Sequence, residues 1–159
     1  MTSVFKIAAC DLSYLLDANL MVYAAAEDSA QHSRARAWVE NQLNESDGFV
    51  GICWASLYGF VRLVSNRMVM GEAALPVMRA WAAAEIYLGQ PATRLIDPGP
   101  SHPDIASRLV ETPGLSANDV PDVYLAALAI EHGLILATHD HGFGRFVNLN
   151  WEDPLAPDS

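Results

Sequence analysis

The chain of 159 residues is poor in cysteine, with two in all, Cys10 and Cys53. Two cysteines this far apart lack the close spacing of a thiolate zinc site, and they are too few for a dense disulfide framework. Neither device is therefore expected to support the fold. A reducing compartment, the cytoplasm, is the simplest expectation for such a protein.

Long hydrophobic runs are also missing. No apolar stretch approaches the roughly 18 residues that a membrane-spanning helix needs. The first 20 residues carry one lysine, Lys6, and are interrupted by Asp11 and Asp17 where a signal peptide would be apolar. The sequence therefore predicts no membrane segment and no signal peptide.

Positive charge is scarce. Lysine and arginine number 9 against 19 acidic residues, which gives a formal net charge of −10 at pH 7. A passive nucleic-acid-binding surface is disfavoured, because phosphate contacts need a cationic footprint. An enzyme that binds nucleic acid through metal ions and a local arginine cluster stays open. The acidity also fits a basic partner, or simply a soluble surface.

Apolar side chains are abundant, at 52% of the residues, and they occur in short runs with alternating strand and helix periodicity. This alternation predicts one α/β domain over 1–159, with its core at about 14–155, built as a sandwich around a mainly parallel sheet. The expected strands are 14–16, 48–53, one within 93–100, 134–138 and an edge strand near 148–155. The expected helices are 19–26, 32–43, 54–67, 72–84, 103–111 and 120–131.

Three aspartates stand where a parallel sheet would bring them together. Asp17 directly follows the first strand, and Asp140 follows the apolar run "LILAT" by one residue. Asp122 lies in the first turn of the helix 120–131, and helices run antiparallel to the strands they connect. That turn therefore faces the carboxyl edge of the sheet, where ligands bind in folds of this class. We expect the three carboxylates to converge there.

Three carboxylates in one place repel one another, so they must be protonated, separated or neutralised by a cation. Oxygen ligands without a His or Cys set favour Mg²⁺, or Mn²⁺, over zinc. A site of this kind polarises a phosphate and lowers the pKa of a bound water for in-line attack. Phosphodiester hydrolysis is the chemistry that this arrangement favours.

Each aspartate also has an ordinary structural interpretation. Asp122 follows Asp119 by three residues, which resembles a helix-capping arrangement favoured by the helix dipole. Asp17 alone fits a turn, and Asp140 alone fits an exposed loop. Only their conjunction at one sheet edge favours a metal site.

The polar residues around these aspartates have similarly open roles. Asn19 is interpreted first as the N-cap of the helix 19–26, with an outer-shell role beside the site as the second reading. His139 and His141 flank Asp140 and are interpreted as solvated loop residues rather than ligands.

Four segments of the chain are informative together: "LLDANLMVYA", "LYGFVRLVSNRMV", "PDVYLAALAIEHGLILATHDHGFGRF" and "NWEDPL". From about Leu15 to Leu155 the chain thereby resembles PIN-domain ribonucleases, specifically the VapC-type toxins of bacterial toxin–antitoxin pairs. The resemblance implies a PIN-like α/β/α sandwich and a Mg²⁺- or Mn²⁺-dependent endoribonuclease that cuts cellular RNA such as tRNA or rRNA, using one or two ions. It also implies a homodimer and inhibition by a cognate antitoxin.

Carried over by position, the resemblance makes Asp17, Asp122 and Asp140 the catalytic and metal-binding carboxylates. The family's remaining glutamate, three residues before an arginine, is replaced by Gly59, while Arg62 is retained. The resemblance gives Arg62 an orienting or RNA-contacting role, against the plain interpretation of an exposed helix residue.

Two further positions bear on this departure from the family pattern. Asp119 lies one helical turn before Asp122 and is a candidate to compensate for the missing acid. The family's acidic residue two positions after Asp140 is also absent and is replaced by Gly142.

Two other functions compete with the endoribonuclease. The first is a catalytically weak PIN domain that chiefly binds its antitoxin, which Gly59 and the net charge favour. The second is a phosphoacceptor receiver domain, which also places an aspartate after a strand. That chemistry usually uses a lysine near the site, and Lys6 precedes the first strand.

Overall fold

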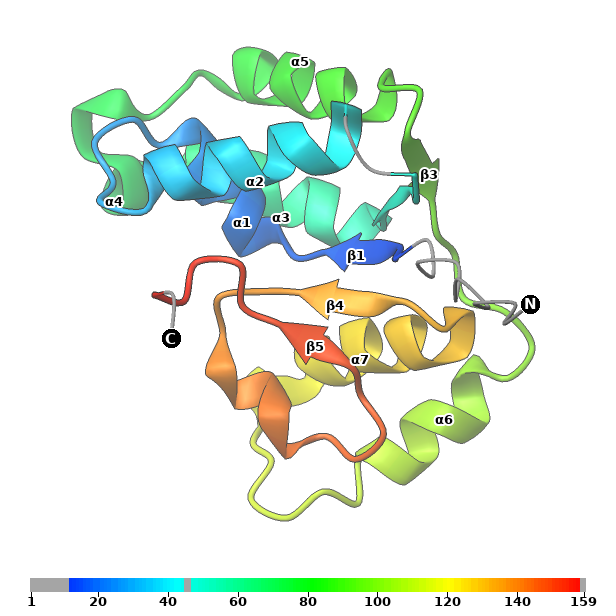
Figure 1. Ribbon diagram of the computed structural model, residues 1–159. Helices are drawn as coiled ribbons and strands as arrows, with labels where there is room; N and C mark the ends of the chain where they lie inside the picture. The colour runs from blue at the N-terminus through cyan, green and yellow to red at the C-terminus, as the bar shows by residue number, and fades with distance from the viewer. Residues whose placement is uncertain (1–11, 45–46, 158–159) are drawn as a thin grey trace, which may run out of the picture.

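The computed structural model describes residues 12–44 and 47–157 (Figure 1). Lys6, Cys10 and Asp11, which entered the expectations above, lie outside the described residues. Cys53 is described, and it is a buried free thiol in the core.

Within this part of the chain, five parallel strands form one sheet in the order β3-β2-β1-β4-β5 (Figure 1). The strands are β1 (Tyr14–Leu16), β2 (Val50–Ile52), β3 (Thr93–Leu95), β4 (Ile135–Ala137) and β5 (Trp151–Glu152). The predicted parallel α/β fold and its short edge strand are confirmed. The chain winds outward in one direction from β1 through β2 to β3, and in the other through β4 to β5. The β1–β4 boundary is therefore the switch point of the topology, where α/β sheets bind ligands.

Helices cover both faces of the sheet and make it a three-layer sandwich. One face carries α1 (Ala18–Ala25), α2 (His32–Asn44), α3 (Trp54–Val64) and α5 (Val77–Leu88), and the other carries α6 (His102–Leu109) and α7 (Val120–His132) (Figure 1). The shorter elements are α4 (Arg67–Met70) and the 3₁₀ helices η1 (Gly71–Ala73), η2 (Ala117–Asp119) and η3 (His141–Arg145). No helix in the described ranges is both long and apolar enough to cross a membrane.

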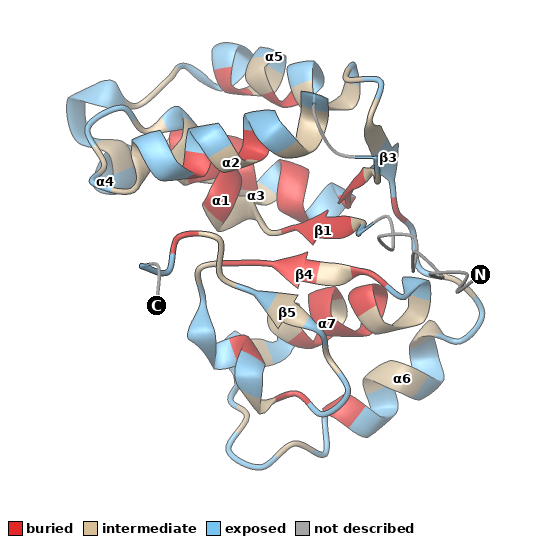
Figure 2. Ribbon diagram, in the orientation of Figure 1, coloured by how far each residue is buried: buried red, intermediate tan, exposed pale blue. Residues whose placement is uncertain are grey.

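The strand β1 is apolar at every position because both of its faces are covered. Tyr14 and Leu16 belong to the apolar cluster under α1, α2, α3 and α5, while Leu15 points into the cluster with α6 and α7. In β4, Leu136 and Ala137 divide between the two clusters in the same way. Buried residues accordingly line the central strands in Figure 2.

The helix α7 is the most deeply buried helix on its face, as its nearly uniform apolar sequence predicts. Its buried residues are Val123, Leu125, Ala126, Ala127, Leu128 and Ala129. Gly133 ends the helix in the left-handed conformation, with a φ of 63°, which glycine adopts without a Cβ penalty. The chain then enters β4 directly, and the Leu134 amide donates back to the Ala129 carbonyl of α7 over 2.9 Å.

Two predicted helices have different bounds. The prediction of one helix over 54–67 is wrong, because α3 ends at Val64 and Asn66 starts α4 by accepting a hydrogen bond from the Met68 amide. The prediction of a helix over 72–84 is also wrong. Here α5 begins only after Pro76, whose ring fixes the backbone for a helix start but not for a helix interior.

Candidate active site

The carboxyl ends of β1 and β4 lie side by side and carry two of the predicted aspartates. Leu16 is opposite Ala137 in the sheet, and the backbone N–H of Asp17 donates to the carbonyl of Ala137 over 3.1 Å. Asp140 follows β4 by two residues on the same edge. Asp17 stands at the N-cap position of α1, but its side chain makes no capping hydrogen bond. The carboxylate instead lies near the backbone amides of Ala18 and Asn19 and accepts a hydrogen bond from Thr138.

A buried hydroxyl links these two strand ends. Thr138 is 0% exposed, and its Oγ1 donates to Oδ2 of Asp17 over 2.7 Å. The same oxygen accepts from the Asp140 backbone N–H and from Nδ2 of Asn19, each at 3.0 Å. One donated and two accepted bonds use the whole capacity of a hydroxyl. Thr138 therefore fixes the orientation of the Asp17 carboxylate.

Asn19 is a bridging residue and not a helix cap, so the capping interpretation is wrong. It lies in the first turn of α1, which begins at Ala18. Its side chain donates to Thr138 and accepts from the His139 backbone N–H over 3.3 Å. The Asn19 side chain is therefore linked to the Asp17 carboxylate by two hydrogen bonds through Thr138, and it is also joined to the loop that follows β4.

The third aspartate comes from α7 and is paired with an arginine from η3. Nη2 of Arg145 lies 3.3 Å from Oδ2 of Asp122 and 2.8 Å from Oδ1 of Asp119. The other oxygen of Asp119 accepts from the backbone N–H and hydroxyl of Ser116 in a capping box around η2. These Ser116 bonds, together with Arg145, lower the pKa of Asp119 to about 2. Asp119 is thus engaged as a cap and an ion-pair partner.

Electrostatics tie Asp122 to the two strand-end aspartates. Burial raises the pKa of Asp122 to about 6, with further contributions from the charges of Asp140 and Asp17 that Arg145 partly offsets. Burial is also the main cause that raises the pKa of Asp17, against hydrogen bonds from Thr138 and from backbone amides, and Asp140 raises it further. The three carboxylates are therefore near enough for their charges to interact, and the pKa values of Asp17 and Asp122 are raised.

This donor set fits a hard divalent cation. All of its side-chain ligands are carboxylate oxygens, the type that Mg²⁺ and Mn²⁺ prefer. Burial is the main cause of the raised pKa values of Asp17 and Asp122, and repulsion from neighbouring carboxylates adds to it. A bound cation would remove that repulsion. The residues present are consequently suited to hold one.

The position of the missing glutamate is close to Asp17. A Cβ added to Gly59 would lie 3.4 Å from Cβ of Ala18, the residue after Asp17, in ordinary contact. Position 59 on α3 therefore faces the start of α1. Arg62 follows one turn later, is exposed, and has no ion-pair or hydrogen-bond partner for its guanidinium in the described part of the chain.

The second departure from the family pattern has a local reason. The Gly142 amide donates to Oδ1 of Asp140 over 2.8 Å. A Cβ at this position would lie 2.9 Å from the same oxygen, so a side chain here would displace the carboxylate. With the present loop conformation, glycine at 142 leaves room for Asp140.

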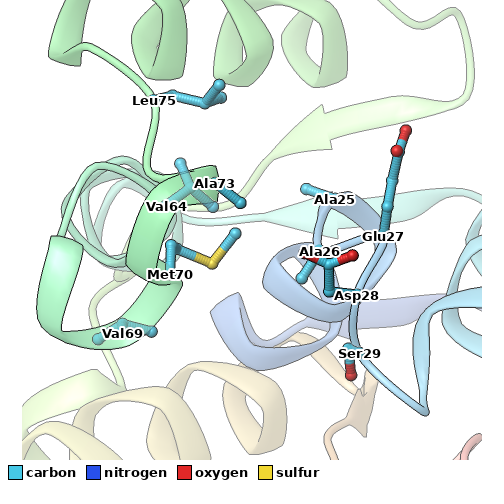
Figure 3. Close-up of a pocket in the computed structure, with 10 residues that line it drawn as sticks. All are labelled: Ala25, Ala26, Glu27, Asp28, Ser29, Val64, Val69, Met70, Ala73 and Leu75. Atoms are coloured by element: carbon cyan, nitrogen blue, oxygen red, sulfur yellow. The ribbon is translucent and has the colours of Figure 1, made fainter.

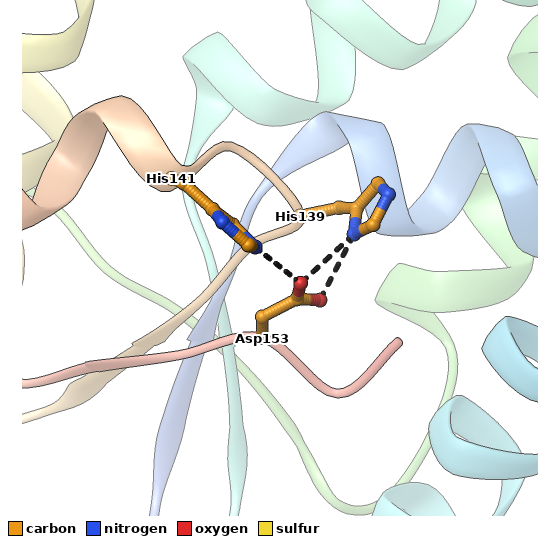
Figure 4. Close-up of side chains that lie close together, drawn as sticks. All are labelled: His139, His141 and Asp153. Carbon is orange, nitrogen blue, oxygen red and sulfur yellow. Dashed lines mark hydrogen bonds and ion pairs between the residues drawn. The ribbon is translucent and has the colours of Figure 1, made fainter. Parts of the chain in front are cut away.

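Sequence reasoning missed three features beside these aspartates. One is Thr138, whose only signal was a hydroxyl residue that ends an apolar run just before Asp140. Another is Arg145, one of few basic residues in an acidic chain. The third is the contact of His139 and His141 with Asp153 (Figure 4), which contradicts their interpretation as merely solvated.

Asp140 is the exposed member of the three aspartates, whereas Asp17 and Asp122 are partly buried. A cavity of about 500 Å³ lies elsewhere, between the end of α1 on one side and α4 with η1 on the other (Figure 3). None of the three aspartates lines that cavity. A shallow hollow of about 520 Å³ borders the site and is lined by Asn19, Tyr23, His139, Asp140 and His141. An extended polymer can approach such a surface.

Comparison with known proteins gives close relatives along most of the chain. Residues 14–149 match the family described as PIN domain. The chain is similar to ribonuclease VapC37 of Mycobacterium tuberculosis, with 35% identity over 147 residues that cover 89% of this chain and 97% of that protein. It is similar to ribonuclease VapC33 of the same species, with 37% identity over 139 residues that cover 87% and 96%.

Solved structures share the fold at lower identity. The chain superposes on VapBC2 from Rickettsia felis, bound to a DNA fragment from its promoter, with a TM-score of 0.66 at 21% identity over 89% of this chain and 98% of that one. The likeness to VapC20 of Mycobacterium tuberculosis, a sarcin-ricin loop cleaving toxin, has a TM-score of 0.60 at 19% identity over 86% and 98%. At these identities the likeness speaks for the fold alone.

Proposed function

Because the chain belongs to the PIN-domain family, and within it to the VapC ribonucleases, we propose that it is an endoribonuclease toxin of a type II toxin–antitoxin pair. The observation that carries this proposal is the convergence of Asp17, Asp122 and Asp140 on one sheet edge, with their charges coupled. Its substrate is cellular RNA, tRNA or rRNA, which it meets in the cytoplasm.

The proposed cofactor is Mg²⁺, which Mn²⁺ can replace, held by Asp17, Asp122 and Asp140. When bound, such an ion supplies a more acidic water and neutralises charge on the scissile phosphate. Thr138 orients the Asp17 carboxylate for metal binding, and Asn19 donates a hydrogen bond to the Thr138 hydroxyl. Arg145 positions Asp122 through its guanidinium.

The exposed guanidinium of Arg62 is the proposed contact for an RNA phosphate. It has no protein partner among the residues described, and it lies one turn from Gly59 on α3. The net charge of −10 makes such local cations necessary, because the molecule as a whole repels RNA.

A cognate antitoxin and a second copy of the chain are the proposed protein partners. Solved structures with this fold include toxin–antitoxin complexes. Large apolar side chains lie exposed on α3 and α5, where the Tyr58 ring makes tilted contacts with Trp54 and Trp81 at centroid distances of 6.4 and 5.5 Å. Tyr58 is 61% exposed, and exposed aromatic groups of this kind are typical of protein interfaces.

The test is RNA cleavage by the purified protein. We expect cleavage of tRNA or rRNA in Mg²⁺, its loss with EDTA, and its return when excess Mg²⁺ is added. Asp17→Asn should abolish cleavage, whereas the control Asp104→Asn should not. That control removes an exposed first-turn carboxylate from α6, away from the cluster. Cleavage that survives EDTA would overturn the metal-dependent mechanism.

The alternative function, an antitoxin-binding module with weak catalysis, draws its support from Gly59 and from the net charge of −10. The chain matches the named relatives, which are ribonucleases, over nearly their whole length, and this favours the enzyme. Tight antitoxin binding by a wild-type protein that cleaves no RNA under any divalent cation would restore the alternative.

A further inference from the structure

We propose that His139, His141 and Asp153 form a binding site for a transition-metal ion of the zinc type, separate from the all-carboxylate centre. The three side chains meet at the outer side of the loop that carries Asp140 (Figure 4). One potential ligand atom from each lies within 4.8 Å of the others.

The distances are close to those between ligands of one ion. Nδ1 of His139 is 3.0 Å from both carboxylate oxygens of Asp153, and Nε2 of His141 is 2.7 Å from Oδ2. Ligands at about 2.1 Å from a tetrahedral ion are about 3.4 Å apart. Small side-chain adjustments therefore suffice to admit an ion between the three groups, whose ligand atoms lie within 4.8 Å of one another.

The sheet register brings these residues together from distant parts of the chain. Ala137, the last residue of β4, is paired with Glu152, the last residue of β5. The Thr138 amide extends this ladder by donating to the Glu152 carbonyl over 3.0 Å. His139 and Asp153 therefore leave neighbouring parallel strands at the same level, and the site is anchored by two strands.

The carboxylate is also held in place. The Asp153 side chain is 6% exposed, and its Oδ1 accepts from the Leu155 amide over 2.9 Å. Among the described residues, the Asp153 carboxylate is hydrogen-bonded to the imidazoles of His139 and His141 and to the Leu155 amide. Two imidazoles and one carboxylate are therefore arranged with the charged ligand rigid and buried.

The imidazole rings are oriented by aromatic neighbours. The His139 ring packs edge-on against Tyr23 with centroids 5.6 Å apart, and the His141 ring lies 5.6 Å from Trp151. The His141 side chain is 68% exposed. Three protein ligands with one side open to water is the arrangement that leaves an exchangeable position on the ion.

The donor set discriminates this site from the carboxylate centre. Imidazole nitrogen favours zinc and its neighbours in the transition series, whereas Mg²⁺ takes oxygen ligands. A single carboxylate with two neutral imidazoles also avoids the repulsion of three clustered aspartates. The site of His139, His141 and Asp153 therefore favours zinc over Mg²⁺, although Asp140 stands between the two histidines in the chain. If the chain is the proposed ribonuclease, zinc bound by His139, His141 and Asp153 (the outer site) also fixes the loop that carries Asp140.

The test is calorimetric titration of the tag-free, chelator-treated protein with ZnCl₂. We expect one Zn²⁺ per chain and at least tenfold weaker binding in His141→Gln and in Asp153→Asn. His32→Gln, a histidine on α2 outside the cluster, should bind like wild type, and so should Asp122→Asn. Co²⁺ should give a visible absorption band in wild type, His32→Gln and Asp122→Asn. The band should be lost in His141→Gln and in Asp153→Asn.

The variants and the readout separate this proposal from the ribonuclease. His141 is mostly exposed, so its replacement keeps the fold even if Asp153→Asn does not. No Zn²⁺ binding by wild type, or binding that His141→Gln leaves intact and Asp122→Asn removes, would overturn the outer site. Zinc binding at the outer cluster without any RNA cleavage would overturn the ribonuclease alone.

Discussion

The hydroxyl of Thr138 shows how a single buried group can set the geometry of a surface site. It joins Asp17 and Asn19 at the start of α1 to the backbone of Asp140 after β4, and so reinforces the pairing of β1 with β4. A sequence pattern could not reveal this, because threonine at the end of an apolar strand is common and its partners come from another strand and helix.

Replacing this group tests its importance. Thr138→Val keeps the shape but leaves two part-buried donors, Nδ2 of Asn19 and the Asp140 amide, without this acceptor, which costs roughly 1 kcal/mol of unfolding free energy. It also frees the Asp17 carboxylate, so Mg²⁺ affinity and RNA cleavage should both fall. Thr138→Ser keeps the hydroxyl and should retain most of each property. Urea unfolding and Mg²⁺ titration measure these effects, and a Val variant equal to the Ser variant would contradict them.

The second prediction at this scale concerns the pH dependence of Asp122 in the metal-free protein. Its pKa is raised from 3.8 to about 6 in the folded state, so the folded protein binds more protons than the unfolded chain between these values. Stability should therefore rise as the pH falls from 7 toward 5, by about 1–2 kcal/mol after allowance for solvent screening. The pKa of Asp119 is lowered to about 2, so its protonation changes the stability only below this pH range.

The control for this prediction is Asp122→Asn, which has no titrating group at that position. Its stability should exceed that of wild type at pH 7, and the difference between the two proteins should shrink toward pH 5. Guanidinium unfolding at a series of pH values gives the comparison. Parallel curves for the two proteins would show that Asp122 titrates as an ordinary carboxylate.

Among the elements, α3 carries the departure from the family pattern. Gly59 occupies its interior, where glycine costs about 1 kcal/mol relative to a good helix former. Gly59→Glu should therefore raise stability and, since position 59 faces Ala18 beside Asp17, should also strengthen Mg²⁺ binding. Gly59→Gln has the same size without the charge, so it should show the gain in stability alone. Equal Mg²⁺ affinity in both variants would place residue 59 outside the metal's reach.

Elements were predicted well where apolar periodicity was strong and less well where local hydrogen bonds decide. The buried helix α7 and the apolar strands β1 and β4 follow directly from their composition. The break after α3 depends on the side chain of Asn66, which competes with the helix by capping the next turn. The late start of α5 follows from Pro76. The predicted helix over 72–84 began too early because the segment before Pro76 also has helical periodicity.

At the scale of the whole molecule, parallel topology is what makes the candidate site predictable. Asp17 and Asp140 could be expected on one edge because both follow strands, and Asp122 because it opens the helix before β4. The contact of Asp153 with the two histidines was out of reach, since it depends on the register of β5, a strand of only two residues. Short edge strands carry too little pattern to fix a register from sequence.

The same scale sets the most direct test of the central claim, that carboxylates from three distant segments jointly hold a catalytic cation. The measurement is the rate of RNA cleavage by Asp122→Asn in saturating Mg²⁺, beside wild type and the control Asp104→Asn. Our account predicts cleavage at background level, weaker Mg²⁺ binding and an intact fold, with the control unchanged. Because Asn caps a helix about as well as Asp, a purely capping Asp122 would leave the variant fully active. Full cleavage with unchanged Mg²⁺ affinity in Asp122→Asn would contradict the account.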